Sequence, residues 1–504
     1  MKTNNHLTIW KKVSVFIGIL FLSAGALDLY SKSISPIQYG LLNARNGEDR
    51  YRVLYRVHVD ALKNQWSVDY SGISVIDITI PKDAVSIPLG NQTDFRGVVF
   101  NVLNRNKDIF LFSLVNPSKS VDLNPTVLDS KSVSGALKSR RKRYLLNVED
   151  QNKWTERVGY SEVVKRKDIL LIKKGKIKGD AISGYNSFGS KPKFEVIEVS
   201  EEEKYIRNIV FNRNPDSSKI TYLVDAQNQY NLKIQNVTIN TPKSSLTADR
   251  AISLRNCLNI EVSNVTINGT YSQSDAYGYG LYLNNIRDIL FEGLSASGNW
   301  GVFGSYCVVN AQLRKCKINR FDVHCYARDI VFEDCIIHDL YNQFSSLYGS
   351  LVFQRCYFDK AIPVLLESSY NAYTPFKIIM EDCTMNIDAS HNCLVSAGRL
   401  DLGINQRSEL RERTWPSVTV KNLSVIVPRG LKEFYLYRVR DFGKKSVSID
   451  GVCDIDIKGL SFILEDSDDK VKFVLCNKPV VLKNLRTCEI ESNLSKKNII
   501  NNLR

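Results

Sequence analysis

A short pattern of apolar and polar positions recurs along the second half of the chain. In each copy, an apolar residue is followed three positions later by Val, Leu or Cys, usually with a polar or small residue just before the second position. Repetition every 20 to 40 residues is typical of a solenoid, in which each repeat is one coil that buries its apolar face on its neighbours. The pairs are Ile234/Val237, Val262/Val265, Phe291/Leu294, Leu313/Cys316, Phe332/Cys335, Phe353/Cys356, Met380/Cys383, Val420/Leu423, Ile457/Leu460 and Leu482/Leu485.

The residues within each repeat predict strands rather than helices. β-Branched, aromatic and Cys residues form short runs separated by Asn, Asp and Gly, without an apolar period of 3.6 residues. The regular Leu-x-x-Leu-x-Leu frame of leucine-rich repeats is absent. The sequence therefore predicts an all-β fold, with a parallel β-helix over residues 206–490 and a C-terminal tail at 491–504.

A second column of apolar residues recurs at steps of 20 or 21 residues. It predicts that Leu281, Val302, Val323, Phe344 and Val364 point into the core. Because stacked strands lie about 4.8 Å apart, the residues that follow them become neighbours on the outer face of one wall. These outward residues are Tyr282, Phe303, His324, Ser345 and Leu365, with Asn284, Ser305, Tyr326, Leu347 and Glu367 in the next outward column.

The region 27–205 reads as a β-rich cap with the first coils of the β-helix and a basic insertion. Alternating or apolar runs at 74–81, 98–102 and 109–115 predict strands. The basic residues gather at 138–143 and 165–178. A solvated face is the favoured interpretation of these charges, and a polyanion-binding patch is the alternative.

The N-terminus resembles a secretory signal. Lys2, Lys11 and Lys12 precede an apolar run of 15 residues, which is shorter than the ~20 residues of a membrane-spanning helix. Ala24-Gly25-Ala26 supplies the small residues after which a signal peptidase cleaves. We therefore expect a signal peptide at 1–26, no membrane span after its removal, and a periplasmic, cell-surface or secreted protein. An uncleaved anchor is the alternative.

The net charge indicates which classes of binding partner are favoured. Loss of residues 1–26 would remove three lysines and no acid from a chain whose net charge is +15. A basic exported protein meets acidic polysaccharide or a membrane surface more readily than nucleic acid, although the charge also serves solubility.

All 11 cysteines lie in the second half, and several share one repeated position. Buried free thiols are predicted rather than disulfides.

Three segments carry a resemblance to a known superfamily: Asn231-Leu-Lys-Ile-Gln-Asn-Val-Thr-Ile239, Asn259-Ile-Glu-Val-Ser-Asn-Val-Thr-Ile267 and Asp329-Ile-Val-Phe-Glu-Asp-Cys-Ile-Ile337. They resemble the pectin-lyase-like superfamily of right-handed parallel β-helices. The resemblance implies a carbohydrate polymer bound along the stacked strands. The paired aspartates of polygalacturonase-like hydrolases, the Asp-Pro-His-Glu motif of alginate epimerases and an acidic cluster like the calcium site of pectate lyases are absent. No cofactor or metal is therefore predicted; calcium stays an open alternative that no motif supports, and the reaction also stays open.

Ionisable side chains concentrate between Arg320 and Arg328. Asp322 and His324 lie two residues apart on a strand, so the carboxylate can orient the imidazole while His324 takes a proton. Tyr326, Arg320 or Arg328 would then donate a proton or neutralise a uronate. This set suits β-elimination, whereas a structural role for His324 on a solvated face is the alternative.

Polar and aromatic residues around this stretch are candidates for sugar binding, because aromatic rings cover the flat faces of sugars well. Glu367 and Asp322 are expected about 10 Å apart. This separation is at or beyond the upper end for the two carboxylates of an inverting hydrolase. Two functions stay open: cleavage of an acidic polysaccharide by lyase-like or hydrolase-like chemistry, and non-catalytic polysaccharide binding or assembly. A structural or adhesin solenoid is a third. The oligomeric state is not predicted. The sugar-binding candidates are Tyr282, Phe303, Tyr341, Asn342, Gln343, Tyr348, Glu367, Tyr370 and Asn371.

Overall fold

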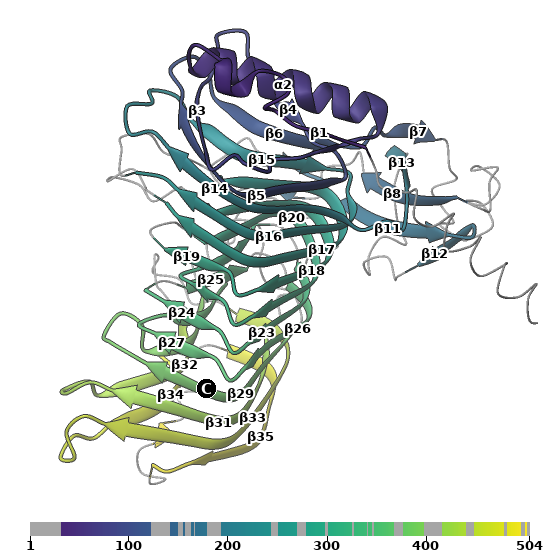
Figure 1. Ribbon diagram of the computed structural model, residues 1–504. Helices are drawn as coiled ribbons and strands as arrows, with labels where there is room; N and C mark the ends of the chain where they lie inside the picture. Colours follow the sequence, from purple (N-terminus) through teal and green to yellow (C-terminus); the bar gives the residue numbers. More distant parts are fainter. Residues whose placement is uncertain are drawn as a thin grey trace, which may run out of the picture.

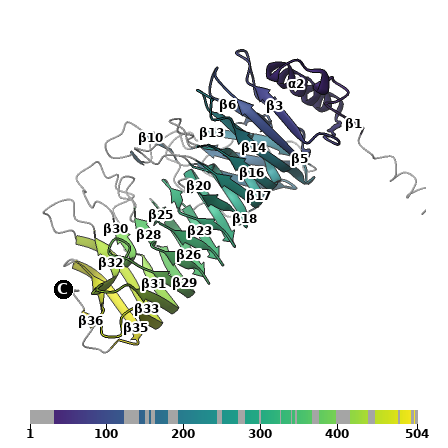
Figure 2. The ribbon, with the colours of Figure 1, turned by 60° about the vertical axis from the view of Figure 1, so that its left-hand side comes forward.

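A computed structural model of the chain shows a long parallel β-helix with an α-helix at its N-terminal end (Figure 1). The predicted all-β, right-handed β-helix is confirmed. The coils stack in sequence order, and the last ones lie at the end opposite the helix (Figure 2). The structure describes residues 32–500 without 122–141, 150–154, 157–162, 166, 179–192, 243–249, 270–278, 298–300, 325–326, 340, 345–346, 367–375, 398–415, 440–447, 478–480 and 495–498.

Each coil has three walls, which we number in the order in which the chain passes through them. The strands that lie only in the first wall are β4 (Ile87–Pro88), β6 (Ile109–Val115), β15 (Thr221–Gln227), β22 (Phe321–Val323), β25 (Tyr341–Phe344), β28 (Ile362–Leu366), β30 (Cys393–Ala397), β32 (Glu433–Val439), β34 (Lys472–Cys476) and β36 (Ile499–Ile500). The strands that lie only in the second wall are β23 (Ala327–Glu333) and β26 (Leu347–Gln354). The strands that lie only in the third wall are β3 (Val75–Thr79), β19 (Ser295–Ser297), β21 (Lys317–Ile318), β24 (Ile336–His338) and β27 (Tyr357–Asp359).

The remaining strands turn a corner and so belong to more than one wall. β17 (Ile252–Asn268) passes through all three, and β18 (Leu281–Glu292) and β20 (Val302–Arg314) pass through the first and second. The strands that join the second wall to the third are β5 (Gln92–Leu103), β14 (Lys204–Arg213), β16 (Tyr230–Asn240), β29 (Phe376–Asn386), β31 (Ser417–Val427), β33 (Ser448–Leu464) and β35 (Val481–Ser492).

The strand register confirms the predicted core pattern. Phe291, Leu313, Phe332 and Phe353 occupy equivalent positions in successive coils, and all four are buried. The rings of Phe332 and Phe353 stack with their centroids 4.8 Å apart. Such burial of apolar surface is what holds one coil to the next.

The predicted free thiols are also confirmed wherever the structure describes them. Eight cysteines are buried and unbridged, and four of them, Cys316, Cys335, Cys356 and Cys383, stand in successive coils. Each of these four donates its Sγ hydrogen to backbone carbonyls, as Cys335 does to the carbonyl oxygen of Leu313 at 3.3 Å. Burial raises the pKa of another core thiol, that of Cys257, to about 12.

The corner between the second and third walls explains the recurring Asn, Asp and Gly. One residue per coil there has a positive φ, a left-handed conformation that Gly, Asn and Asp adopt most readily. Asn236 (φ 53°) donates its side-chain amide to Asn208 at 2.9 Å, and Asn264 donates to Asn236 at 3.3 Å. Gly293 and Gly459 occupy the same position in later coils.

The cap contains a long helix that the prediction of a β-rich region missed. α2 (Gly47–Asn64) follows the short 3-10 helix η1 (Leu41–Asn43), and β1 (Ser33–Ile34) pairs with β2 (Ser67–Val68) beside it. The Asn46 side chain caps α2 by accepting the Asp49 backbone hydrogen at 2.9 Å. α2 covers the first coil, and its buried His58 lies 2.8 Å from the Tyr70 hydroxyl.

The basic insertion forms an antiparallel sheet docked on the side of the β-helix (Figure 1). Arg287 of β18 donates to the Asp168 carboxylate at 2.7 Å and to the Ile169 carbonyl at 2.9 Å. Leu258 packs with Ile169 and neighbouring apolar residues of the insertion. The sheet consists of β7 (Lys119–Val121), β8 (Arg143–Glu149), β11 (Lys167–Lys173), β12 (Lys176–Lys178) and β13 (Lys193–Val199), with a separate pair β9 (Thr155–Glu156) and β10 (Val163–Val164).

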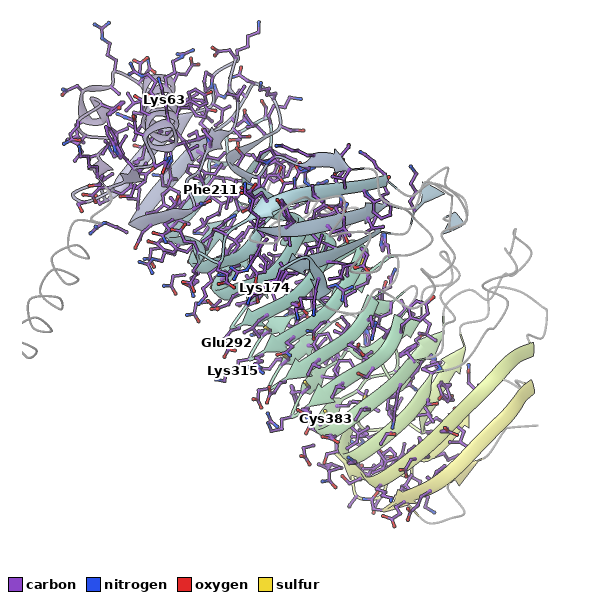
Figure 3. The ribbon with its side chains drawn as sticks, turned by 90° about the vertical axis from the view of Figure 1, so that its right-hand side faces the viewer. Lys63, Lys174, Phe211, Glu292, Lys315 and Cys383 are labelled. Atoms are coloured by element: carbon purple, nitrogen blue, oxygen red, sulfur yellow. The ribbon has the colours of Figure 1, made fainter. Side chains whose placement is uncertain are left out.

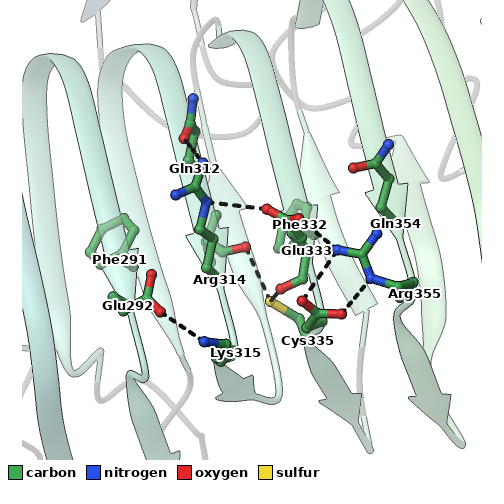
Figure 4. A network of polar contacts seen from close by, with 12 residues as sticks. Phe291, Glu292, Gln312, Arg314, Lys315, Phe332, Glu333, Cys335, Gln354 and Arg355 are labelled. Atoms are coloured by element: carbon green, nitrogen blue, oxygen red, sulfur yellow. Dashed lines mark hydrogen bonds and ion pairs between the residues drawn. The ribbon is translucent and has the colours of Figure 1, made fainter.

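The outer face of the second wall carries ion pairs that cross from coil to coil. Glu333 accepts from Arg314 at 3.2 Å and from Arg355 at 2.6 Å, while Lys315 lies 3.5 Å from Glu292 (Figure 4). Figure 3 shows Glu292 and Lys315 at the edge of the coils. Exposed pairs of this kind each contribute little to stability, so this face is a charged surface rather than a structural core.

Candidate functional site

The predicted outward column on the first wall was wrong in its register. The sequence placed Val302 beside Val323, but the structure pairs Val302 with Phe321, a shift of two residues. A second shift of two pairs Phe344 with Leu366 instead of Val364. Both shifts keep the inward residues buried, because side chains alternate with a period of two. The outward column therefore consists of Tyr282, Phe303, Asp322, Gln343 and Leu365, without His324 or Ser345.

Asp322 lies at the centre of a polar cluster on this wall. Its Oδ2 atom accepts hydrogen bonds from Arg320 and from the Tyr279 hydroxyl, each at 2.6 Å. The Nε2 atom of His324 lies 3.4 Å from the same oxygen. The structure thus brings together Arg320, Asp322 and His324, as the sequence analysis expected, and adds Tyr279 from a preceding coil.

Asp322 is on the outer side of the wall by register, yet its side chain is fully buried. Burial would by itself raise the pKa of the carboxyl, but the Arg320 charge and hydrogen bonds from His324 and Tyr279 outweigh it, so the pKa lies below its ordinary value. Asp322 is therefore ionised at neutral pH. Among the described residues, its other oxygen, Oδ1, has no hydrogen-bond partner.

Arg320 is a buried partner of Asp322 rather than an exposed cation. Its Nη2 atom also donates to the Gln343 side-chain oxygen at 2.6 Å, and its guanidinium lies 5.0 Å from the centre of the Tyr341 ring. A guanidinium held between a carboxylate, an amide and an aromatic ring is fixed in orientation. In this structure Arg320 positions Asp322, and the neutralisation of a uronate predicted for it has no geometric support.

The next coil supports the cluster through Asn342. The Asn342 side chain accepts the Phe321 backbone hydrogen at 3.0 Å and donates to the Pro363 carbonyl at 3.1 Å. Asn342 is therefore a buried bridge between three coils, not a surface residue that faces a sugar. Gln343 and Tyr341 belong to the cluster through Arg320.

His324 is partly exposed, as are Tyr279 and Tyr341, and its side chain is 16% exposed. Its backbone N–H donates to the Gly304 carbonyl at 2.9 Å, which fixes the end of β22. A His beside a buried, ionised carboxylate is oriented by it and stabilised when it gains a proton. The geometry thus permits the proton transfer that the sequence analysis assigned to His324.

Other predicted residues lie apart from this cluster or outside the described part of the chain. Arg328 is on β23, where its Nε atom donates to Asp329 at 3.1 Å. Tyr348 pairs with Arg328 in the next coil. Tyr282 is on the first wall two coils before Asp322, and the Arg250 guanidinium lies 4.5 Å from its ring centre. Tyr326, Glu367, Tyr370 and Asn371 lie outside the described residues, as does the side chain of Phe303.

Two side-chain contacts on this wall were not predicted from the sequence. Tyr279 is 43 residues before Asp322, and only the stacking of coils places its hydroxyl on the carboxylate. Arg255 donates through Nε to Asp225 at 3.1 Å, three and four coils before β22. In the sequence, only the residue types of Tyr279 and Arg255, in the coils before Asp322, pointed to polar contacts on this wall.

Two negative findings apply to the part of the chain that the structure describes. No group of three or more His, Cys, Asp or Glu side chains there has an arrangement that could hold a metal ion. No helix there is both long and apolar enough to cross a membrane, and residues 1–26 lie outside it.

Much of the positive charge of the insertion is balanced locally. Lys142 pairs with Glu198 at 2.7 Å, and Lys165 and Lys167 pair with Glu149 at 3.4 and 2.9 Å. Arg143 and Lys173 both contact Glu201. These pairs favour the solvated face over a polyanion-binding patch at these positions, while 138–141 lies outside the described residues.

Comparison with known proteins finds similarity in structure but not in sequence. No protein-family model and no curated protein sequence matches the chain. The tailspike protein gp49 of Pseudomonas phage LKA1 has a similar fold, with a TM-score of 0.53 at 12% identity over 90% of this chain and 81% of gp49. At this identity the similarity establishes the fold alone: this chain has the β-helix architecture of a tailspike.

Two further tailspikes match more distantly. The tailspike gp61 of Pseudomonas phage phi297 gives a TM-score of 0.45 at 10% identity, over 92% of this chain and 84% of gp61. Gp54 of the Acinetobacter baumannii bacteriophage AP22, solved in complex with A. baumannii capsular saccharide, gives 0.37 at 12% identity, over 90% of this chain and 79% of gp54.

Proposed function

We propose that this chain is an exported polysaccharide-active β-helix protein that binds an acidic polymer along its first wall. The observation that carries the proposal is the contact between His324 and the buried Asp322 on a wall built from stacked strands. Stacked strands repeat the same surface at each coil, which suits a ligand that is itself a repeating chain. The tailspike-like fold supports a polysaccharide as the ligand.

The chemistry that this site suits best is β-elimination. His324 would remove the proton alpha to the carboxylate of a uronic acid, and the electron pair left behind would form a carbon–carbon double bond as the glycosidic oxygen leaves. The leaving oxygen takes a proton from water to give a new hydroxyl end, and His324 returns its proton to the solvent. Asp322 would orient His324 and stabilise the imidazolium. Asp322 is less suited to hydrolysis, because its carboxylate is buried and bound to Arg320.

Non-catalytic binding is the second candidate, and one observation favours it. Arg320, the nearest cation, is held by Asp322 and Gln343, so it does not make the alpha proton of a bound uronate more acidic. In that case the wall would hold a surface polysaccharide without cleaving it.

One assay separates these functions. The full chain is incubated with polygalacturonate, alginate, hyaluronan and neutral dextran, and the ultraviolet absorbance of unsaturated uronates is followed together with reducing ends. Rising absorbance on an acidic polymer is the expected result. Reducing ends without absorbance would indicate hydrolysis and overturn elimination. Retained binding with neither signal would establish the non-catalytic function.

A further inference from the structure

A cavity lies in the cap, away from the first-wall cluster. It has a volume of about 690 Å³. That volume lies within the ~300–1,000 Å³ of small-molecule sites. The cavity is open to solvent and is bordered by α2, the segment 39–45 before it and the segment 81–85 after β3. Figure 1 shows α2 at the end of the β-helix, many coils from β25.

The cavity is lined by tyrosines and arginines in two neighbouring rows. Tyr51 and Tyr55 are four residues apart on α2, as are Arg52 and Arg56, so each pair lies on one face of the helix. Arg45 reaches the cavity from the segment before the helix. Tyrosine and arginine are the residues that bind flat and anionic ligand groups most effectively.

Hydrogen bonds hold the lining in place without a ligand. The buried Tyr51 donates its hydroxyl to the Val85 carbonyl, which joins α2 to the segment 81–85. The Tyr39 hydroxyl donates to Asp60 at 2.7 Å, which joins α2 to the segment before it. A cavity preformed in this way needs little ordering when a ligand enters.

The charges that line the cavity favour an anion. Arg52 is neutralised by Glu48 at 3.5 Å and Asp83 at 3.2 Å. Arg45 and Arg56 are exposed, and neither forms an ion pair with a described residue. The other acid of the lining, Asp49, lies in the first turn of α2, where the helix dipole favours its ionised form. Arg45, Arg52 and Arg56 against Asp49 and Asp83 leave the lining with one net positive charge, which favours an anion over a cation.

We propose that this cap cavity binds a sugar that carries a carboxylate. Arg45 and Arg56 supply the positive charge that attracts the carboxylate, and the partly exposed rings of Tyr39 and Tyr55 cover the face of the sugar. The volume accommodates one or two sugar units rather than a polymer running through. This site is separate from the first wall and does not depend on His324.

Isothermal titration of the full chain with glucuronic acid and a galacturonate disaccharide tests the proposal. We expect saturable binding that weakens about tenfold or more in the variant Arg45→Gln/Arg56→Gln, a change of at least ~1.4 kcal/mol. Lys63→Gln is the matched control, since it removes a positive charge from the exposed side of α2, outside the lining (Figure 3). It should bind within about twofold of the unchanged chain.

Further arms fix the ligand and separate this site from the wall. Glucose should bind at least about tenfold more weakly than glucuronic acid. Adding Arg45→Gln/Arg56→Gln to His324→Ala should still weaken binding of glucuronic acid about tenfold or more. Inorganic phosphate that binds as tightly as glucuronic acid would overturn the sugar-specific proposal. Affinity that the double arginine change leaves unaltered, in the unchanged chain or in His324→Ala, would overturn the cap site. Circular dichroism of each variant confirms that α2 is retained.

Discussion

Arg287 on the β-helix and Asp168 on the inserted sheet form an ion pair whose side chains are only 8% and 2% exposed. The pair joins residues 119 positions apart in sequence. The sheet therefore docks through a buried charge contact, next to the apolar contact between Ile169 and Leu258. It is fixed at the corner between the first and second walls, where Asn285 also donates to Asn147 at 2.8 Å.

Replacing one partner of this pair should destabilise the protein strongly. Arg287→Met leaves Asp168 buried without its cation, and we expect the free energy of unfolding to fall by ~3–5 kcal/mol. Arg287→Met/Asp168→Leu should recover much of that loss, because no isolated charge stays buried. Urea unfolding followed by fluorescence measures both. Lys315→Met, which removes an exposed pair, should change stability by under ~1 kcal/mol. Equal stability of Arg287→Met and the unchanged chain would contradict the prediction.

The pair of Arg320 and Asp322 predicts a pH-dependent effect. Arg320→Met leaves the Asp322 carboxylate buried and unpaired at neutral pH, which should cost ~3–5 kcal/mol. Since the pKa of Asp322 is lowered in the folded protein, its stabilisation is present above the ordinary carboxyl pKa and is lost as pH falls through the folded value. The variant and the unchanged chain should therefore converge in stability in acid. A difference that stays constant down to pH 3 would refute this role. Arg328→Met, which removes a pair with side chains 29% and 42% exposed, is the control.

The buried His58 predicts a second dependence of stability on pH, which comes from a neutral base rather than from a carboxylate. Burial lowers the pKa of His58 to about 3. The unfolded chain binds a proton near pH 6.5 and the folded chain does not, so stability should fall by about 1.4 kcal/mol for each pH unit below 6.5. The variant His58→Gln should lose this slope even if its stability at neutral pH is lower. An unchanged slope in that variant would show that another group is responsible.

The left-handed corner residues predict a difference between two substitutions at one site. Asn236 has a φ of 53°, and Gly occupies the same column at 293 and 459. Asn236→Gly should therefore cost under about 1 kcal/mol, whereas Asn236→Val should cost more than about 2 kcal/mol, since a β-branched residue is strained at positive φ. Thermal unfolding of the two variants side by side checks this. Equal melting temperatures would rule out the corner as the cause of the Asn pattern.

The fold was predictable because the core pattern repeats. Phe332 and Cys335 recur in kind from coil to coil, and a repeated apolar step leaves few alternatives to stacking. The register between β20 and β22 was not predictable, because a slip of two residues keeps Val302 and Val323 inward in either alignment. Helix α2 had signals that were overlooked: the capping Asn46 and a buried face at helical spacing.

The site was predictable in part. Asp322 and His324 lie close together because they are two residues apart at the end of β22, and the local sequence contains that information. The burial of Asp322 depends on Tyr279 and Arg320, and Tyr279 comes from a different coil. Long-range burial of this kind leaves no local pattern in the sequence. Arg320 donates to Asp322 and Gln343, and its predicted role toward a uronate stays a prediction.

The most direct test of the account is affinity electrophoresis of three proteins in gels that contain the acidic polymer retained best by the unchanged chain. The other two are His324→Ala on the first wall and Gln312→Ala on the outer face of the second wall. We expect His324→Ala to weaken binding about tenfold or more and Gln312→Ala to stay within about twofold. Equal retention of His324→Ala and the unchanged chain, or a larger loss in Gln312→Ala, would contradict the assignment of the first wall as the polysaccharide site.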